Sequence, residues 1–210
     1  SSPSHTYAAP GVYNVRLVAF ETAGCRDTII QQVTVKSIPT ADFTIPDACM
    51  LAPVSPVNTS TDLINQAMTY SWDFGDGTPL ETGENPAHSY QTAGTYTVTL
   101  VATNQDGCTD TRTRTITVYQ LPPVEAGIDQ QLCPYTSMTL NGSGAQFYTW
   151  NNNAMNGTPF IPEVDGKYIV TGTDANGCID KDTLVLTLYA VPSINLGSDM
   201  TICANNFPVN

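Results

Sequence analysis

Residues 70–77 read Tyr-Ser-Trp-Asp-Phe-Gly-Asp-Gly, and this stretch decides the fold. Its three aromatic side chains alternate with polar residues, which places all three rings on one face of a β-strand. The Gly-Asp-Gly that follows suits a backbone with positive φ, and it predicts a tight turn where the strand ends. Because burial of large rings dominates the energetics of a small domain, we expect Trp72 to be a core anchor.

The same period of two recurs on both sides of this stretch. Residues 96–103 read Tyr-Thr-Val-Thr-Leu-Val-Ala-Thr, and residues 115–118 read Thr-Ile-Thr-Val. Apolar residues that alternate with threonines are typical of half-buried antiparallel strands. Turn signals separate such segments along the whole chain, and no stretch has helical spacing. The sequence therefore predicts an all-β sandwich architecture.

The chain contains an internal repeat. Residues 3–35 align without a gap on residues 86–118 at an offset of 83, which matches His5 with His88 and Tyr7 with Tyr90. A third unit repeats the Asn-Gly-Cys-x-Asp pattern, and Pro192 to Cys203 match Pro122 to Cys133 at an offset of 70. We therefore expect a chain that begins inside one repeat and stops inside another, with prolines stiffening the short linkers.

Composition excludes several classes of function. Charged residues make up only 12% of the chain, and 19 acidic residues against 7 basic ones give a net charge of −12. Nucleic acids and anionic membranes both require a face rich in Lys and Arg, so neither is an expected partner. The apolar runs are only a few residues long, which excludes insertion of a helix into a membrane.

Three segments together carry a family resemblance. Residues 70–77, the Asn-Pro-Ala-His-Ser-Tyr at 85–90 and the Ala-Gly-Thr-Tyr-Thr-Val-Thr-Leu at 93–100 resemble the polycystic-kidney-disease (PKD) domain, an immunoglobulin-like β-sandwich with a WDFGDG-type motif. The motif residues are Trp72, Asp73, Phe74, Gly75, Asp76 and Gly77. The third unit keeps Trp150 but lacks the DFGDG turn, so it resembles a shorter PKD-like or Ig-like repeat. The resemblance implies tandem immunoglobulin-like sandwiches.

This resemblance divides the chain into four parts. Residues 1–38 are expected to be the C-terminal half of a PKD-type repeat, and residues 39–120 a complete PKD domain. Residues 121–190 are expected to form the shorter PKD-like or Ig-like domain, and residues 191–210 to start a further repeat.

Arrays that mix these two repeat types resemble the very large surface adhesins of Bacteroidota-type bacteria, some of which act in gliding motility and are exported by the type IX system. The resemblance implies a non-catalytic stalk or adhesive surface of a secreted, cell-surface protein. Its partners would be neighbouring repeats, other cell-surface or secretion-system proteins, or surface polymers. Two alternatives stay open: an accessory module of a secreted hydrolase, and a subunit of an extracellular filament or sheath.

The six cysteines alternate between two contexts along the chain. Each complete repeat has one early and one late cysteine, so the economical pairing joins Cys49 to Cys108 and Cys133 to Cys178. A metal site is the competing interpretation, but the chain has no Cys-x-x-Cys pair and only two histidines. Disulfides are favoured, and they imply an oxidising, extracellular compartment.

No constellation of nucleophile and base stands out, so we expect no enzyme activity and no catalytic residue. His5 and His88 are interpreted as packing residues at strand starts. Asp73 and Asp76 could form a carboxylate pair for acid–base chemistry, but an Asx-type turn that accepts backbone N–H bonds is favoured.

Two further sites follow from the resemblance alone. Some PKD-type domains bind Ca²⁺ near the aspartate turn, which makes Asn58, Ser60, Asp62 and Asp73 candidate ligands; no other cofactor is expected. The Asp-Thr-Ile and Asp-Thr-Leu segments resemble a Bacteroidota O-glycosylation motif, with Thr28 and Thr183 as acceptors.

Overall fold

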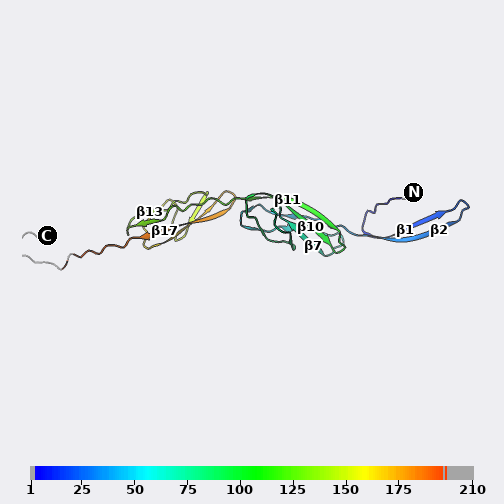
Figure 1. Cartoon of the computed structure of the whole chain (residues 1–210), viewed down its shortest axis with the longest axis horizontal. Coiled ribbons are helices and arrows are strands. Elements are labelled where there is room, and N and C mark those ends of the chain that lie inside the picture. The colour runs from blue at the N-terminus through cyan, green and yellow to red at the C-terminus, as the bar shows by residue number, and fades with distance from the viewer. Residues whose placement is uncertain (1–2, 196, 198–210) are drawn as a thin grey trace, which may run out of the picture. The chain divides into compact units, whose positions relative to one another are not determined.

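The computed structural model describes residues 3–195 and 197 of the chain, and these residues form strands, turns and loops (Figure 1). The chain divides into two compact units, Ser1–Leu121 and Pro122–Asn210. Within the described residues, no helix is long and apolar enough to cross a membrane. The expected repeat start at residues 191–210 falls largely outside the described part of the chain, as does Cys203.

The first unit opens with a long hairpin of β1 (Gly11–Phe20) and β2 (Arg26–Val35). The two strands pair in antiparallel register, from Gly11 opposite Val35 to Phe20 opposite Arg26. Strands in which apolar and polar residues alternate favour this pairing. Gly24 supplies the positive φ of 88° that the connecting turn requires. The hairpin is a two-stranded sheet of its own.

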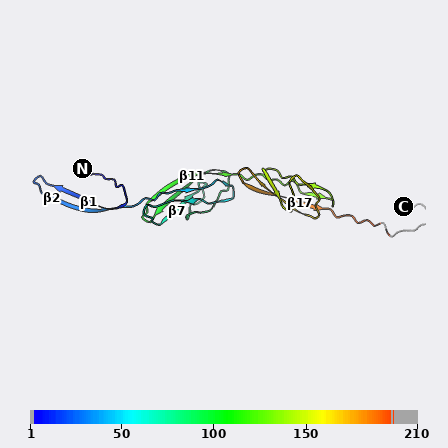
Figure 2. The same cartoon turned by 180° about the vertical axis from the view of Figure 1, so that it is seen from behind.

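A two-layered sandwich follows in the same unit (Figure 1), and Figure 2 shows it from behind. One layer is a five-stranded sheet in the order β4-β11-β10-β7-β8. The other layer consists of two short pairs, β3 with β6 and β5 with β9. The strands are β3 (Phe43–Thr44), β4 (Ala48–Cys49), β5 (Pro53–Val54), β6 (Val57–Asn58), β7 (Met68–Asp73), β8 (Glu81–Thr82), β9 (His88–Ser89), β10 (Gly94–Asn104) and β11 (Thr109–Tyr119).

The core of this sandwich lies between the two layers. Trp72 of β7 is fully buried, packs edge-on against Phe43 of β3 at 5.0 Å between ring centroids, and donates from its indole N–H to the Gly83 carbonyl at 3.0 Å. The alternate residues Val98, Leu100 and Ala102 of β10 are also fully buried. The period of two read from the sequence thus selects the face that packs into the core, and Trp72 is the anchor that the sequence predicts.

The second unit is a smaller sandwich. One sheet has the order β12-β17-β16-β14, and β13 pairs with β15. Its core contains Trp150, Tyr168, Val170, Leu184 and Leu186. The strands are β12 (Gln130–Leu132), β13 (Met138–Thr139), β14 (Phe147–Trp150), β15 (Pro159–Phe160), β16 (Gly166–Thr173) and β17 (Ile179–Leu188). The all-β prediction is confirmed.

The predicted cysteine pairing is wrong. Cys108 and Cys133 carry free thiols, as does Cys25, whereas Cys49 and Cys178 are disulfide-bonded residues. Within the first unit Cys49 lies opposite Tyr119, at the end of β11, and Cys108 directly precedes Thr109, at the start of the same strand. An eleven-residue strand spans about 33 Å, whereas a disulfide requires Cα atoms within about 7 Å of each other.

The second unit excludes its predicted pair for the same reason. Cys133 follows Leu132, which lies opposite Leu188 at the end of β17, and Cys178 directly precedes the start of that strand. In both units, therefore, the early cysteine lies near the end of the last strand and the late cysteine lies at the tip of the long hairpin. Two cysteines of one unit cannot reach each other.

We expect Trp72→Ala to lower the unfolding free energy of the first unit by about 3–5 kcal/mol, because it leaves a large cavity and an unpaired Gly83 carbonyl. The slowest-exchanging β10 amides report this free energy by hydrogen exchange. Thr69→Ala, on the exposed face of the same strand, is the matched control and should change the value by less than about 0.5 kcal/mol. An equal effect of both substitutions would contradict the role of Trp72.

We also expect an alkylating reagent, added to the unfolded chain without reductant, to label Cys25, Cys108 and Cys133 and to spare Cys49 and Cys178. After reduction, all of these positions should be labelled. Peptide mapping by mass spectrometry measures the labelling. A recovered peptide pair joining Cys49 to Cys108 would show that the strand geometry is misjudged.

Candidate functional site

The turn after β7 requires a glycine at its centre. Gly75 has a φ of 76°, and a Cβ atom placed there would lie 2.5 Å from the backbone oxygen of Thr97 on the neighbouring strand β10. Both the left-handed conformation and this close approach exclude a larger residue. Gly77 also has a positive φ, of 82°. The Gly-Asp-Gly segment therefore packs the turn tightly against the sheet.

Both aspartates of the motif accept hydrogen bonds within this turn. Asp73 Oδ1 accepts the N–H of Gly75 at 2.8 Å, and Asp76 Oδ1 accepts the N–H of Thr78 at 3.1 Å and its hydroxyl at 2.6 Å. These are Asx turns, in which the side chain satisfies a backbone donor two residues ahead. The Asx-turn interpretation of the pair is confirmed.

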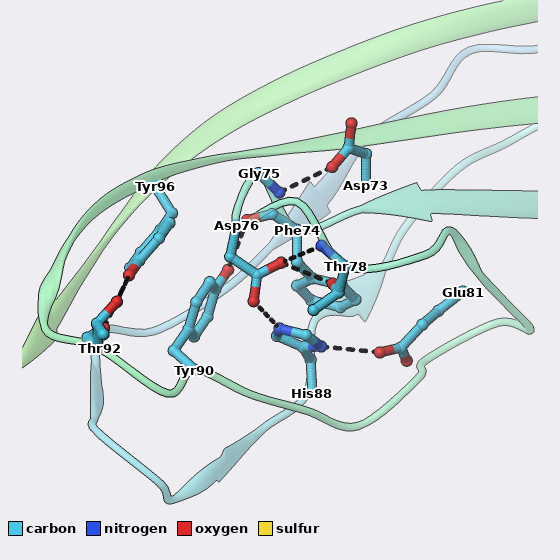
Figure 3. Close-up of polar contacts among 10 residues, drawn as sticks. All are labelled: Asp73, Phe74, Gly75, Asp76, Thr78, Glu81, His88, Tyr90, Thr92 and Tyr96. Carbon is cyan, nitrogen blue, oxygen red and sulfur yellow. Dashed lines mark hydrogen bonds and ion pairs between the residues drawn. The ribbon is translucent and has the colours of Figure 1, made fainter.

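His88 lies between two carboxylates, as Figure 3 shows. Its Nε2 is 2.9 Å from Asp76 Oδ2, and its Nδ1 is 2.8 Å from Glu81 Oε1. The imidazole is 6% exposed, and its ring stacks on Phe74 with centroids 4.2 Å apart. His88 is thus the packing residue at the start of β9 that the sequence predicts, with two acidic partners in addition.

Both ring nitrogens of His88 have a carboxylate partner. An ionised carboxylate accepts hydrogen bonds and cannot donate them, so each contact is a hydrogen bond when the ring nitrogen carries hydrogen. Asp76, His88 and Glu81 therefore form a charged cluster that joins the turn, β8 and β9, and each member is used in holding the others in place.

The aromatic side chains beside the cluster complete its packing. The Tyr90 hydroxyl donates to the Phe74 carbonyl at 3.1 Å, and burial, together with the negative charge of Asp76, raises the pKa of Tyr90. The Tyr96 ring stacks on Tyr90 at 4.4 Å, and its hydroxyl donates to the Thr92 carbonyl four residues upstream at 2.8 Å. This backward bond is the tyrosine corner of immunoglobulin-like sandwiches.

The predicted calcium ligands do not converge, so this hypothesis is wrong. Asp73 lies opposite Thr99, in the middle of β10, whereas Asp62 contacts the side chain of Asn104, the last residue of that strand. Five residues of β-strand separate the two positions by about 17 Å, and Ca²⁺ needs its oxygen ligands within about 2.6 Å. Among the described residues, no three His, Cys, Asp or Glu side chains gather in a metal-binding arrangement.

Each of the other candidate ligands has a structural role. Asp62 is buried and accepts hydrogen bonds from the Asn104 amide at 3.0 Å, the Ser37 hydroxyl at 3.0 Å and the Ile64 N–H at 3.0 Å. The Asn104 bond contributes most to holding the pKa of Asp62 below its ordinary value. Asn58 Oδ1 accepts the N–H of Ser60 at 2.9 Å, and Ser60 bonds to the backbone of Asp42.

The two proposed glycosylation sites lie on strands, and both threonines are exposed. Thr28 is in β2, where its N–H donates to Asp27 at 2.8 Å. Thr183 is in β17, and the Asp182 carboxylate before it accepts the N–H of Ala126 at 2.7 Å. Both sites stay predictions.

Glu81 is a functional neighbour of His88 that the sequence does not predict. Glu81 precedes His88 by seven residues in a polar loop. This spacing alone does not predict a contact between the two side chains, because the contact depends on the pairing of β8 with β7. The pairing of Trp72 with Glu81 across these strands brings the carboxylate to the imidazole. Periodicity in the sequence does not predict contacts that depend on how two strands pair across a loop.

Comparison with known proteins identifies one domain type. Residues 36–118 match the family model of the PKD domain. This segment contains the whole charged cluster and the first unit's sandwich, so the resemblance seen in the WDFGDG-type motif is confirmed there. The assignment to a Bacteroidota adhesin stays a prediction.

This chain spans only a few per cent of the length of the curated relatives that it matches. Human polycystin-1 is 35% identical over 111 residues, which are 48% of this chain and 2% of polycystin-1. The pre-pro-metalloprotease PrtV of Vibrio cholerae is 44% identical over 61 residues, which are 29% of this chain and 6% of PrtV. The crystal structure of the PKD1 domain of Vibrio anguillarum Epp is 38% identical and covers 40% of this chain and 95% of that domain, with a TM-score of 0.36.

We expect Asp76→Asn to lower the unfolding free energy of the first unit at pH 7 by about 1–3 kcal/mol, because it removes a charged acceptor from a nearly buried cluster. Burial raises the pKa of Asp76, but hydrogen bonds from Thr78 and His88 outweigh it and bring the pKa below its ordinary value of 3.8. A pKa lowered by folding contributes stability above pH 3.8 that is lost as the pH falls through the folded pKa.

The parent chain should therefore lose more stability between pH 5 and pH 2 than the Asp76→Asn variant does. Denaturant unfolding at several pH values measures the difference. Glu84→Gln, on the exposed loop nearby, serves as the control and should keep the pH profile of the parent. If the Asp76→Asn profile is parallel to that of the parent, the cluster contributes no charge-dependent stability.

Proposed function

We propose that this chain is a non-catalytic, force-bearing segment of a secreted cell-surface protein, and that it serves as a stalk or adhesive surface. One observation carries the proposal: in each unit the first strand of the main sheet pairs in parallel with the last. In the first unit β4 pairs with β11, and in the second unit β12 pairs with β17. The same connection occurs in two sandwiches of different length.

Parallel pairing of the first and last strands sets how each unit resists force. A pull on the two ends of the chain draws the first strand toward its N-terminal side and the last strand toward its C-terminal side. Because the two strands run in the same direction, the bonds between them are loaded together in shear, and they do not open one after another. The rate of unfolding under load then depends on this patch of bonds.

The patch includes an aspartate in each unit. Asp47 accepts the N–H of Thr117 at 2.8 Å and the hydroxyl of Tyr119 at 3.2 Å, and Met50 N–H donates to the Tyr119 carbonyl at 2.8 Å. In the second unit Asp129 accepts the N–H of Val185 at 2.8 Å, and Tyr189 N–H donates to the Leu132 carbonyl at 2.8 Å. Side-chain bonds thus reinforce the backbone pairing at the same place.

Two other features support the non-catalytic part of the proposal. Both aspartates of the WDFGDG turn accept backbone N–H groups, and Asp76 also contacts His88 of β9, which is the role of a scaffold. The β1–β2 hairpin repeats the β10–β11 hairpin at an offset of 83 residues, as expected of a tandem array. The presence of disulfide-bonded cysteines, Cys49 and Cys178, supports an extracellular location.

The finer proposal is a large adhesin of the gliding-motility type, exported by the type IX system. Its contacts would be neighbouring repeats of the same chain, other surface or secretion-system proteins, or surface polymers. The net charge of −12 supports this, because like charge on successive repeats disfavours their collapse onto one another.

A second candidate function has its own support. Besides PrtV, the microbial collagenase of Vibrio alginolyticus is 39% identical over 62 residues, which are 30% of this chain and 8% of the collagenase. Relatives of this kind favour an accessory module of a secreted hydrolase. In that case the chain would position a catalytic domain on a polymer, and recognition would depend on its loops.

We expect Asp47→Ala to shorten the lifetime of the first unit at constant force by about fivefold, since it removes bonds worth about 1 kcal/mol from the sheared patch. Pulling the full chain by single-molecule force spectroscopy measures both units in one trace. The second unit is the internal control and should keep its lifetime, and Asp129→Ala should reverse the pattern. Units that yield without measurable resistance, or lifetimes unaffected by either substitution, would refute the stalk. Binding to collagen fibres without such resistance would favour the accessory module.

A further inference from the structure

The second unit has the tyrosine of a tyrosine corner, but the corner bond is not formed. Each repeat places a tyrosine two residues after a glycine, at positions 13, 96 and 168. The Tyr13 hydroxyl donates to the Ala9 carbonyl at 2.7 Å. The Tyr96 hydroxyl donates to the Thr92 carbonyl at 2.8 Å. The Tyr168 hydroxyl has no hydrogen-bond partner in the described part of the chain, although this residue is only 7% exposed. A buried hydroxyl of this kind needs a partner from outside the fold.

Tyr168 lines a pocket of the second unit, which we call the Tyr168 pocket. Its volume is about 390 Å³, and sites for small ligands have roughly 300–1,000 Å³. The Phe160 ring lies 5.5 Å from the Tyr168 ring, measured between centroids. Apolar, amide and carboxylate side chains share the lining, which includes Tyr168, Phe160, Met155, Ile161, Asn153 and Glu163.

The first unit fills the corresponding place with its own side chains. There the turn after β7 and the segment after β9 supply Phe74 and Tyr90, which are 1% and 0% exposed and are joined by a hydrogen bond. In the second unit β14 and β15 take the positions of β7 and β9. The sequence after Trp150, however, is Asn-Asn-Asn-Ala-Met, without the aromatic residue of the WDFGDG-type motif. The pocket is therefore a property of the second unit itself.

Hydrogen bonds fix the loop of residues 151–158, which forms one side of the Tyr168 pocket. Asn156 Oδ1 accepts the indole N–H of the buried Trp150 at 3.0 Å. The N–H of Gly157 donates to the Leu140 carbonyl at 2.8 Å. Because the loop is held in place before a ligand arrives, binding costs less conformational entropy.

Glu163 determines which charge the pocket favours. Among the described residues that line the pocket, Glu163 is the only one with an ionised side chain at neutral pH, and no residue of this set or of the rest of the described chain pairs with its carboxylate. The chain as a whole has a net charge of −12. Both charges disfavour an anionic ligand and favour a cationic one.

An arginine side chain combines the properties that this lining can bind. Its alkyl stem can pack against apolar side chains such as Met155 and Ile161. Its planar guanidinium can stack on the rings of Phe160 and Tyr168. The guanidinium N–H groups donate to carboxylate, amide and hydroxyl oxygens, and the bonds to a carboxylate are the strongest of these. A neutral sugar would gain no attraction from the charge of the pocket.

We propose that the Tyr168 pocket binds an arginine side chain presented by a partner protein. Glu163 accepts hydrogen bonds from the guanidinium, and the Tyr168 hydroxyl oxygen accepts another. The second unit thereby contributes an adhesive contact that the first unit, whose own side chains fill the same place, does not make. This inference does not rest on the mechanical role proposed above, because the pocket lies outside the sheared strands.

The test titrates the isotope-labelled full chain with the capped peptide Gly-Gly-Arg-Gly-Gly and follows the backbone amides by NMR. We expect saturable shifts at positions 153, 163 and 168, while the amides of β10 in the first unit keep their positions. The same peptide with citrulline in place of arginine has the same shape and no charge. It should bind at least about tenfold more weakly.

Three substitutions separate binding in the pocket from general attraction to an acidic chain. Glu163→Gln should weaken binding of the arginine peptide at least about tenfold, and Tyr168→Phe about fivefold. Tyr168→Phe should also keep the thermal midpoint of the second unit, since the hydroxyl has no internal bond to lose. Glu125→Gln, at an exposed glutamate of the same unit outside the lining, is the matched control and should leave the affinity unchanged.

Several results would overturn the proposal. These are the absence of saturable shifts, equal binding of the arginine and citrulline peptides, and equal weakening by Glu163→Gln and Glu125→Gln. A parallel titration with cellohexaose tests the alternative ligand class. If cellohexaose shifts the same amides and the arginine peptide does not, the pocket is a saccharide site and the proposal is wrong.

Discussion

The need to cover one face of a long hairpin organises this protein. A strand with a period of two presents its apolar side chains on a single face, and burial of that face drives the rest of the sandwich to assemble. In the first unit β10 and β11 are covered by the short pairs of the second layer and flanked by the Trp72 strand. In the second unit β16 and β17 have the same position, with Trp150 opposite Val170. On β1 and β2, which form a two-stranded sheet of their own, the same residue types are exposed.

The polar residues around the core have the function of fixing loops. Asp76, His88 and Glu81 join a turn to two strands, and Asp62 joins a loop to Asn104 and Ser37. Asp62 and His88 are buried, and a buried polar or charged group is tolerated only when its hydrogen bonds are satisfied. The acidic residues that suggested a cation site therefore accept hydrogen bonds from groups of the fold itself. In the first unit the chemistry of the WDFGDG-type motif is structural.

The two complete units share a plan in which the ends of the main sheet matter most. The first strand lies beside the last, an aspartate of the first strand region bonds to the last strand, and a cysteine lies at each end of the sheet. This plan separates the cysteines of one unit by the length of a strand. It also concentrates the bonds between the two chain ends of a unit in one place.

The sequence by itself determined the class of fold and the tryptophan that anchors the core of the first unit. Period two, turn glycines and the Trp72 stretch are local signals, and local signals suffice to predict strands, a tight turn after residue 74 and a buried tryptophan. The Asx turns at Asp73 and Asp76 were predictable for the same reason, because each joins residues two apart.

Only the tertiary structure decided which distant groups meet. Cys49 and Cys108 share a repeat but lie at opposite ends of β11, Asp62 and Asp73 lie at opposite ends of β7, and Glu81 reaches His88 through a strand pairing. The physical reason is that residues about ten apart in an extended strand are separated by about 33 Å, whereas pairing across a sheet brings residues that are far apart in sequence to within about 5 Å of each other.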